Sequence, residues 1–406
     1  MKPVIAVLWI LSIALAIGLT RLAGPDRVGS EPSPSLDEAF SEYDPLRRTY
    51  LISSSLQDFG PDDLPELLRV LVDRREGIAP EEVRLFMLAW ARFDGAGAYA
   101  WAREAPKGWQ GTLTGAAMFA WAYHDGSAAI ATFEEAEDNE GKAVLRQRAI
   151  DGWMRSDDKQ GVYEYLSTTP DFTRRGHFYF LLVGEVMMRE GKDATMRWVE
   201  GLPDDTSNQS KNALFNIVAK MVASDDPVRA AEWFLEHRTR PYSKRALTGI
   251  ARRWVQHNDR PAAFEWLLAM NTDGIREGER DDAIAGGFRT WIQSHPDAAQ
   301  QWLLSTLPNP ALDPAIKEAV KRLLPTDPGV SMAWVQRLDD EAERNTESVR
   351  VGIRWRGRDS EAFDDWLRES DLPEEVRQEI LAVRQPLKKG VRKRVIPKKS
   401  AAVGKP

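Results

Sequence analysis

The chain has 406 residues, of which 43% are hydrophobic and 29% are charged, an ordinary globular composition. It contains no cysteine, so disulfides, thiolate catalysis, Cys-ligated metal centres and a lipid-bearing cysteine anchor are excluded. The formal net charge of −7 is unevenly distributed: residues 384–406 hold nine basic and no acidic residues, so the remainder carries −7 − 9 = −16. The sequence therefore predicts an acidic body joined to a basic tail.

Residues 4–19 are uncharged and almost wholly apolar, with Lys2 before them and Arg21 after them. Such a stretch, with its flanking residues, can span a hydrocarbon core of about 30 Å. Residues 1–23 are therefore expected to form an N-terminal membrane anchor with one transmembrane helix. A cleaved signal peptide is the alternative, because Ala14-Leu15-Ala16 has the small-x-small pattern of a cleavage site.

The charges around the anchor give a weak orientation signal. Lys2 and the terminal amine favour a cytoplasmic N-terminus, whereas Arg21 and Arg27 oppose it. We expect a single-pass membrane protein with its body on the extracytoplasmic (periplasmic) side. Residues 24–36 are rich in proline and serine and are expected to be a linker.

A pair of bulky residues 11 or 12 positions apart recurs along the body. The pairs are Trp90 with Trp101, Trp121 with Phe133, Trp153 with Tyr165, Met187 with Trp198, Val222 with Trp233, Trp254 with Trp266, Trp291 with Trp302, Leu323 with Trp334, and Trp355 with Trp366. Their first members lie 31 to 37 residues apart, which indicates an internal repeat of about 33 residues.

Each repeat has the pattern of two helices separated by a short polar break. The break often contains Asp before Pro, as in Asp226-Pro227 and Asp327-Pro328, which suits an N-cap followed by the first helical position. One such hairpin cannot bury its apolar stripe alone, so neighbouring hairpins must stack. We expect an all-α fold of about ten hairpins over residues 37–384, with a less regular hairpin at residues 45–76 and a final polar helix at residues 373–384.

The repeat resembles the tetratricopeptide-like superfamily of α–α helical hairpins over residues 45–384. The resemblance is carried by the period, the two-helix unit and a small residue four positions before the second aromatic, as in Ala262 with Trp266 and Ala362 with Trp366. It implies a right-handed superhelix, the α-solenoid, that presents a concave surface to peptides or other proteins.

Motifs for catalysis, cofactors or metals are absent from the sequence: there is no phosphate-binding loop, dinucleotide-binding fingerprint, nucleophile elbow or His-Glu-x-x-His. Adjacent carboxylates such as Asp225-Asp226 and Asp339-Asp340 fall mostly at helix starts, where acidic groups suit the helix dipole. We therefore expect no enzyme, no cofactor and no metal site.

Basic residues lie one or two positions before the first bulky residue of several repeats. They are Lys220, Arg252, Arg253, Arg289, Arg322 and Arg354. In stacked hairpins they would align as a basic column along a ligand groove that binds an acidic or C-terminal carboxylate ligand. The other interpretation is that each only complements the dipole at its own helix C-terminus, worth about 0.3–1 kcal/mol.

Residues 385–406 are expected to form a basic disordered tail. Its candidate anion-binding residues are Lys388, Lys389, Arg392, Lys393, Arg394, Lys398 and Lys399. It lacks interleaved aromatics, so a nucleic-acid partner is not expected.

Together these features predict a membrane-anchored helical-repeat scaffold that mediates protein–protein interaction or complex assembly at the cell envelope. The alternative is a protein that binds an envelope polymer or an anionic surface through the basic tail and exposed Trp residues.

Overall fold

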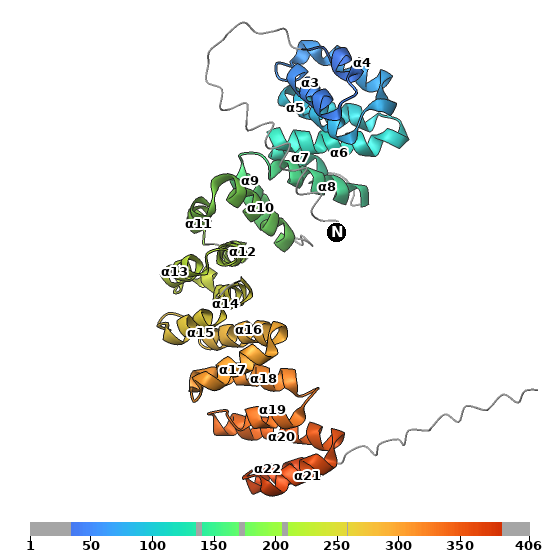
Figure 1. Cartoon of the computed structure of the whole chain (residues 1–406). Helices are drawn as coiled ribbons and strands as arrows, with labels where there is room; N and C mark the ends of the chain where they lie inside the picture. The colour runs from blue at the N-terminus through green and yellow to red at the C-terminus, as the bar shows by residue number, and fades with distance from the viewer. Residues whose placement is uncertain (1–33, 135–139, 170–174, 205–209, 258, 384–406) are drawn as a thin grey trace, which may run out of the picture. The chain divides into compact units, whose positions relative to one another are not determined.

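The computed structural model describes residues 34–134, 140–169, 175–204, 210–257 and 259–383. In these residues the chain forms α-helices, short 3-10 helices and their connections, with no β-strand (Figure 1). The prediction of an all-α fold is confirmed. Contacts within the chain divide it into two compact units, Met1–Leu166 and Ser167–Pro406.

Among the described residues, the first unit consists of helices α2 to α9 and two short 3-10 helices, and α9 ends just beyond the boundary of the unit at Leu166. They are α2 (Leu36–Ser41), α3 (Pro45–Ser55), η1 (Pro61–Asp63), α4 (Leu64–Asp73), η2 (Arg75–Gly77), α5 (Pro80–Arg103), α6 (Lys107–His124), α7 (Gly126–Glu134), α8 (Glu140–Trp153) and α9 (Lys159–Thr168). The irregular hairpin expected at residues 45–76 corresponds to α3 and α4, which η1 separates at Pro61–Asp63. Helix α5 is kinked at Asp94, where the sequence predicts a break between two helices.

The second unit is a series of helical hairpins followed by one last helix. Its elements are α10 (Arg175–Glu190), α11 (Lys192–Gly201), α12 (Ser210–Ala223), α13 (Pro227–His237), η3 (Pro241–Ser243), α14 (Ala246–His257), α15 (Arg260–Ala269), α16 (Glu279–Ser294), α17 (Pro296–Thr306), η4 (Pro310–Leu312), α18 (Asp313–Leu323), α19 (Pro328–Val335), α20 (Glu341–Arg358), α21 (Ser360–Glu369) and α22 (Glu374–Ala382). From α10 to α18, the first helix of each hairpin packs against the first helix of the next (Figure 1).

Recurrent bulky pairs pack the two helices of a repeat against each other. In five hairpins the two aromatic rings pack directly against each other, with centroid separations of 5.3–6.0 Å. These pairs are Trp90 with Trp101, Trp153 with Tyr165, Trp254 with Trp266, Trp291 with Trp302, and Trp355 with Trp366. Aromatic pairs at such distances stabilise by about 0.5–1.5 kcal/mol beyond the area they bury. Each 33-residue repeat of the sequence thus corresponds to one pair of packed helices.

An aspartate at the break of most repeats starts the second helix. The side chain of Asp226 accepts a hydrogen bond from the backbone N–H of Arg229, and Asp327 accepts one from Val330, both at 3.0 Å. Asp94, Asp125, Asp158, Asp259 and Asp359 make the same contact three residues on. These carboxylates satisfy N–H groups that a helix start leaves unpaired, so they are N-caps.

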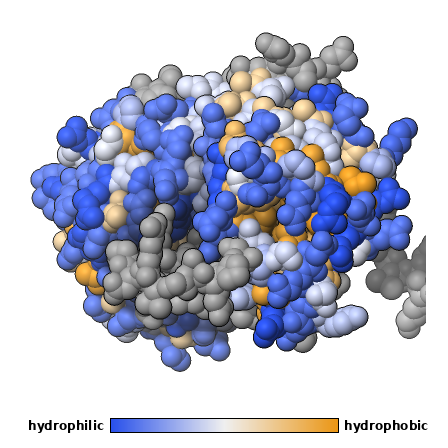
Figure 2. Space-filling model, turned by 90° about the horizontal axis from the view of Figure 1, so that it is seen from above, coloured by the Kyte–Doolittle hydropathy of each residue, from blue (hydrophilic) through white to orange (hydrophobic). Residues whose placement is uncertain are grey.

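On the face of the molecule drawn in Figure 2, polar residues predominate and apolar residues gather in small patches. No helix in the described part of the chain combines the length and apolarity needed to cross a bilayer. The predicted anchor (residues 1–23), most of the predicted linker and the basic tail lie outside the described residues. Every described Trp is buried or half-buried.

Candidate ligand-binding site

One repeat position carries a basic side chain in four successive first helices. It lies two residues before the first bulky residue and is occupied by Lys220 in α12, Arg252 in α14, Arg289 in α16 and Lys321 in α18. Three of the four belong to the predicted basic column, and Lys321 occupies the fourth position. A second repeat position, five residues before the bulky residue, holds glycine in α14 and α16 and glutamate in α18.

The basic side chains reach across to the next helix. A Cβ atom placed on Gly249 would lie 2.6 Å from Cε of Lys220, so the lysine stem lies flat against α14. A Cβ on Gly286 would lie 3.6 Å from Cδ of Arg252, so this arginine lies against α16. Lys220 also lies in the last turn of α12, where a positive charge suits the helix dipole, so its side chain serves its own helix end and contacts the next helix.

Positive charge is concentrated where α12 meets α14. Lys220 is open to solvent on one side, yet burial lowers its pKa, and the charges of Arg252 and Arg253 lower it further. In the described part of the chain, Lys220 and Arg252 have no acidic partner, and Arg253 bonds only the amide oxygen of Gln256, at 3.2 Å. Lys220 and Arg252 therefore lie together with no acidic partner among the described residues, and the charge of Arg253 adds to theirs, an arrangement that an anionic ligand would stabilise.

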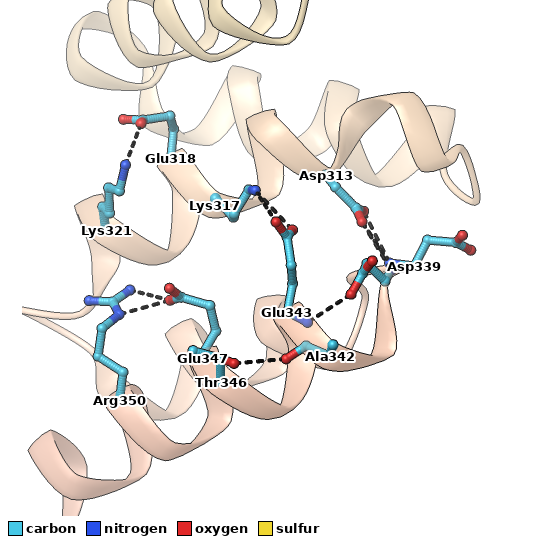
Figure 3. Close-up of polar contacts among 11 residues, drawn as sticks. Asp313, Lys317, Glu318, Lys321, Asp339, Ala342, Glu343, Thr346, Glu347 and Arg350 are labelled. Atoms are coloured by element: carbon cyan, nitrogen blue, oxygen red, sulfur yellow. Dashed lines mark hydrogen bonds and ion pairs between the residues drawn. The ribbon is translucent and has the colours of Figure 1, made fainter. Parts of the chain in front are cut away.

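Where α16 meets α18, two hairpins further along the chain, the same arrangement of basic residues encloses a carboxylate of the chain itself. Glu318, which is 5% exposed, accepts hydrogen bonds from Nε and Nη2 of Arg289 at 2.8 and 3.0 Å and from Nζ of Lys321 at 2.8 Å. Figure 3 shows Lys321 and Glu318 on α18, directed toward each other. Burial by itself raises the pKa of Glu318, but the hydrogen bonds from Arg289 and Lys321 outweigh it and leave the pKa below its usual value.

The remaining predicted column residues lie elsewhere. Arg322 and Arg354 are exposed on α18 and α20, one position before the bulky residue. In α20 the residue two positions before the bulky residue is Ile353, which is not basic, so the basic column ends at α18. The predicted tail residues between Lys388 and Lys399 lie outside the described residues.

Comparison with known proteins gives no relative from which a role could be transferred. No family model, no curated protein and no solved structure matches this chain.

Several acidic residues of the adjacent pairs and their surroundings have structural roles. Asp340 caps α20 through the N–H of Glu343 at 2.8 Å, and Asp313 accepts the N–H groups of both Asp339 and Asp340 at 3.0–3.1 Å (Figure 3). Asp225 pairs with Lys192. Within the described residues, no group of three or more His, Asp or Glu side chains is placed to hold a metal ion.

A cavity of about 400 Å³ lies in the first unit, between the α6–α7 and α8–α9 breaks. Its aspartates include Asp125 and Asp158, both N-caps. Asp158 also accepts a hydrogen bond from Nε1 of Trp153 at 3.0 Å, and Asp125 accepts one from Ser127 at 3.0 Å. These groups are engaged in starting helices and in holding the aromatic pair.

Glu318 and Lys321 were missed by the sequence reasoning, although a signal for both exists. Aligned on the bulky residue, the repeats show basic residues at one position and Gly249, Gly286 and Glu318 at the other. The predicted column combined residues one position and two positions before the bulky residue, and this concealed the pattern. On a helix they point about 100° apart, so only one of them can face the neighbouring helix.

Proposed function

We propose that this protein is a membrane-anchored helical-repeat scaffold, a right-handed α-solenoid, that binds an acidic segment of a protein partner where α12 meets α14. Residues 4–19 anchor it, and its body lies on the extracytoplasmic side. The column residues Lys220 and Arg252 contact the partner's carboxylates, and the nearby charge of Arg253 adds to the attraction.

The observation that carries this proposal is the carboxylate of Glu318. The chain itself places a carboxylate between the basic residues of neighbouring first helices at α16 and α18. Where α12 meets α14 the equivalent basic residues are present, but Gly249 replaces the glutamate. A side chain from another molecule can therefore supply the missing charge, and the absence of a Cβ on Gly249 and Gly286 leaves room for the basic side chains.

The test uses the full chain and a fluorescein-labelled hexaglutamate peptide, with hexaglutamine as the uncharged probe, followed by fluorescence anisotropy. The double variant Lys220→Gln/Arg252→Gln should bind hexaglutamate at least about tenfold more weakly, because each charge-assisted hydrogen bond contributes about 1.5–3 kcal/mol. The matched control Arg322→Gln/Arg354→Gln removes the same charge from exposed positions outside the column. Equal loss in both variants would show non-specific attraction and refute the proposal.

The natural partner can be sought by crosslinking with mass spectrometry in native membranes. Crosslinks from α12 and α14 to an acidic segment of one protein would support the proposal. A reporter active only outside the cytosol, fused to the C-terminus, tests the orientation. A silent reporter on a correctly inserted chain contradicts the extracytoplasmic placement.

The second candidate function is binding of an anionic envelope polymer by the tail. It is favoured by the nine basic and no acidic residues between 384 and 406, and it depends on the tail alone because the described Trp residues are buried or half-buried. Deleting residues 384–406 separates the two functions. Loss of sedimentation with cell-wall material, with hexaglutamate binding retained, assigns polymer binding to the tail and peptide binding to the body.

A further inference from the structure

Helix α3 exposes an apolar stripe near the start of the described chain. Leu46 and Tyr50 are 82% and 70% exposed and lie four residues apart, so they share one helix face. Tyr43, just before the N-cap Asp44, is 98% exposed. On the opposite side Ile52 is fully buried. The stripe therefore faces away from the core of the first unit.

No other large apolar side chain in the described residues is as exposed. The remaining exposed ones range from 36% to 61%. The stripe also carries little net charge, because Arg47 on the same helix pairs with Glu42 at 3.1 Å. Exposed apolar groups gathered on one helix face indicate a contact surface rather than ordinary surface composition.

The chemistry and position of the stripe fit a lipid bilayer. Tyrosine has an apolar ring and a polar hydroxyl, and it is enriched at the boundary between headgroups and acyl chains. A second copy of the chain fits less well. Three side chains offer roughly 500 Å² at most, whereas a standard protein interface takes about 800 Å² from each partner.

The apolar residues 4–19 lie close upstream of this helix. Even fully extended, residues 20–35 span at most about 55 Å. If residues 4–19 cross the membrane, α2 and α3 stay within that distance of its surface. Confinement to such a volume corresponds to an effective concentration on the order of millimolar, at which weak contacts become populated.

We propose that Tyr43, Leu46 and Tyr50 insert into the headgroup boundary of the bilayer that residues 4–19 anchor. This inference rests on the membrane anchoring proposed above. The contact fixes the first unit against the membrane surface, so that the anchor and α3 hold it at two points.

Because the chain has no cysteine, single-cysteine variants can be labelled at one site each. The full-length variants Leu46→Cys and Tyr50→Cys, carrying an environment-sensitive fluorophore, are reconstituted into phosphatidylcholine vesicles that contain lipids with a nitroxide at acyl carbon 5. The controls are Val72→Cys in α4 of the same unit and Val228→Cys in α13 of the second unit. Both replace exposed valines.

We expect nitroxide quenching at positions 46 and 50 to exceed quenching at 72 and 228 by at least about threefold. Vesicle flotation is measured on the same samples. A chain that does not float refutes both the anchor and the stripe. A chain that floats, with equal quenching at all four positions, refutes the stripe alone. Disulfide crosslinking between copies of unlabelled Leu46→Cys, with no quenching, would instead assign the stripe to self-association.

In a second measurement, Leu46→Asp/Tyr50→Asp is combined with a label at Tyr43→Cys. Both substituted positions are exposed, so the helical circular dichroism and melting temperature should not change. Quenching at position 43 should fall to the level at position 72. Unchanged quenching would show that proximity to the membrane comes from the anchor alone.

Discussion

Two places in the second unit share one arrangement and differ in a single charge. Where α16 meets α18, Arg289 and Lys321 enclose the buried carboxylate of Glu318. Where α12 meets α14, Lys220 and Arg252 occupy the equivalent positions, but Gly249 stands where Glu318 would be. The first place contains a carboxylate of the chain itself, and in the second the described residues supply none.

The presence or absence of this carboxylate gives the basic repeat position two different roles. With an internal carboxylate, the basic residues link neighbouring hairpins. Without it, they remain as cations with no acidic partner among the described residues, and an anion from another molecule would relieve their mutual repulsion. Burial first, and then the charges of Arg252 and Arg253, lower the pKa of Lys220.

Supplying the missing carboxylate should have the largest effect. Gly249→Glu places a carboxylate at the position equivalent to Glu318, between Lys220 and Arg252. The lysine stem must move aside, since its Cε lies 2.6 Å from the new Cβ. We expect hexaglutamate affinity to fall at least tenfold, or about 1.4 kcal/mol, measured by anisotropy. Gly249→Gln displaces the lysine equally but adds no charge. If both variants lose the same affinity, steric displacement explains the result and the comparison fails.

Removing the internal carboxylate should have the next largest effect. Glu318→Gln leaves Arg289 and Lys321 without a counter-charge, which should lower the free energy of unfolding by about 1–2 kcal/mol, less than for a fully buried pair because both cations reach solvent. It should also create a second site and raise the hexaglutamate stoichiometry from one to two by titration calorimetry. An unchanged stoichiometry would contradict the equivalence of the two places.

The stability part of that prediction has a defined pH dependence. The folded-state pKa of Glu318 lies below its usual 4.5, so its stabilisation is complete above that value and is lost as the pH falls through the lowered pKa. The difference between the wild type and Glu318→Gln in urea unfolding should therefore shrink as the pH falls below 4.5. A constant difference would exclude the ion pair as its cause.

A smaller effect is expected from raising the pH. Lys220 has a folded-state pKa below its usual 10.5, so it loses its charge at a lower pH than an ordinary lysine, and an anionic ligand prefers the charged form. Hexaglutamate affinity should decrease about threefold as the pH rises through that lowered pKa. Lys220→Arg, which stays charged, should show a flat profile over the same range.

The smallest effect is expected at the two basic residues outside the column. Arg322→Gln and Arg354→Gln, made singly, should change hexaglutamate affinity by less than about twofold, because exposed charges at a distance are screened by salt. The measurement is the same anisotropy titration at physiological ionic strength. A loss comparable to that of Lys220→Gln at either position would extend the site to α18 or α20 and remove its restriction to α12 and α14.

The repeating Trp residues, the Asp-Pro breaks and the lack of alternating apolar patterns determined the helical hairpins from the sequence alone. A residue such as Asp226 caps the helix that it precedes, and Trp254 packs on Trp266 of its own hairpin. These are short-range relations, which periodicity and capping chemistry specify locally.

The tertiary structure alone decided which basic residues act together. Lys321 rather than Arg322 joins the column, because one helix position changes the direction of a side chain by about 100°. Glu318 neutralises the column only at its end, where α16 meets α18. Charge pairing depends on atoms about 30 residues apart in the chain coming within 3 Å, as Arg289 and Glu318 do. Such distances follow from the packing of neighbouring hairpins, which a repeat pattern predicts in outline but not in register.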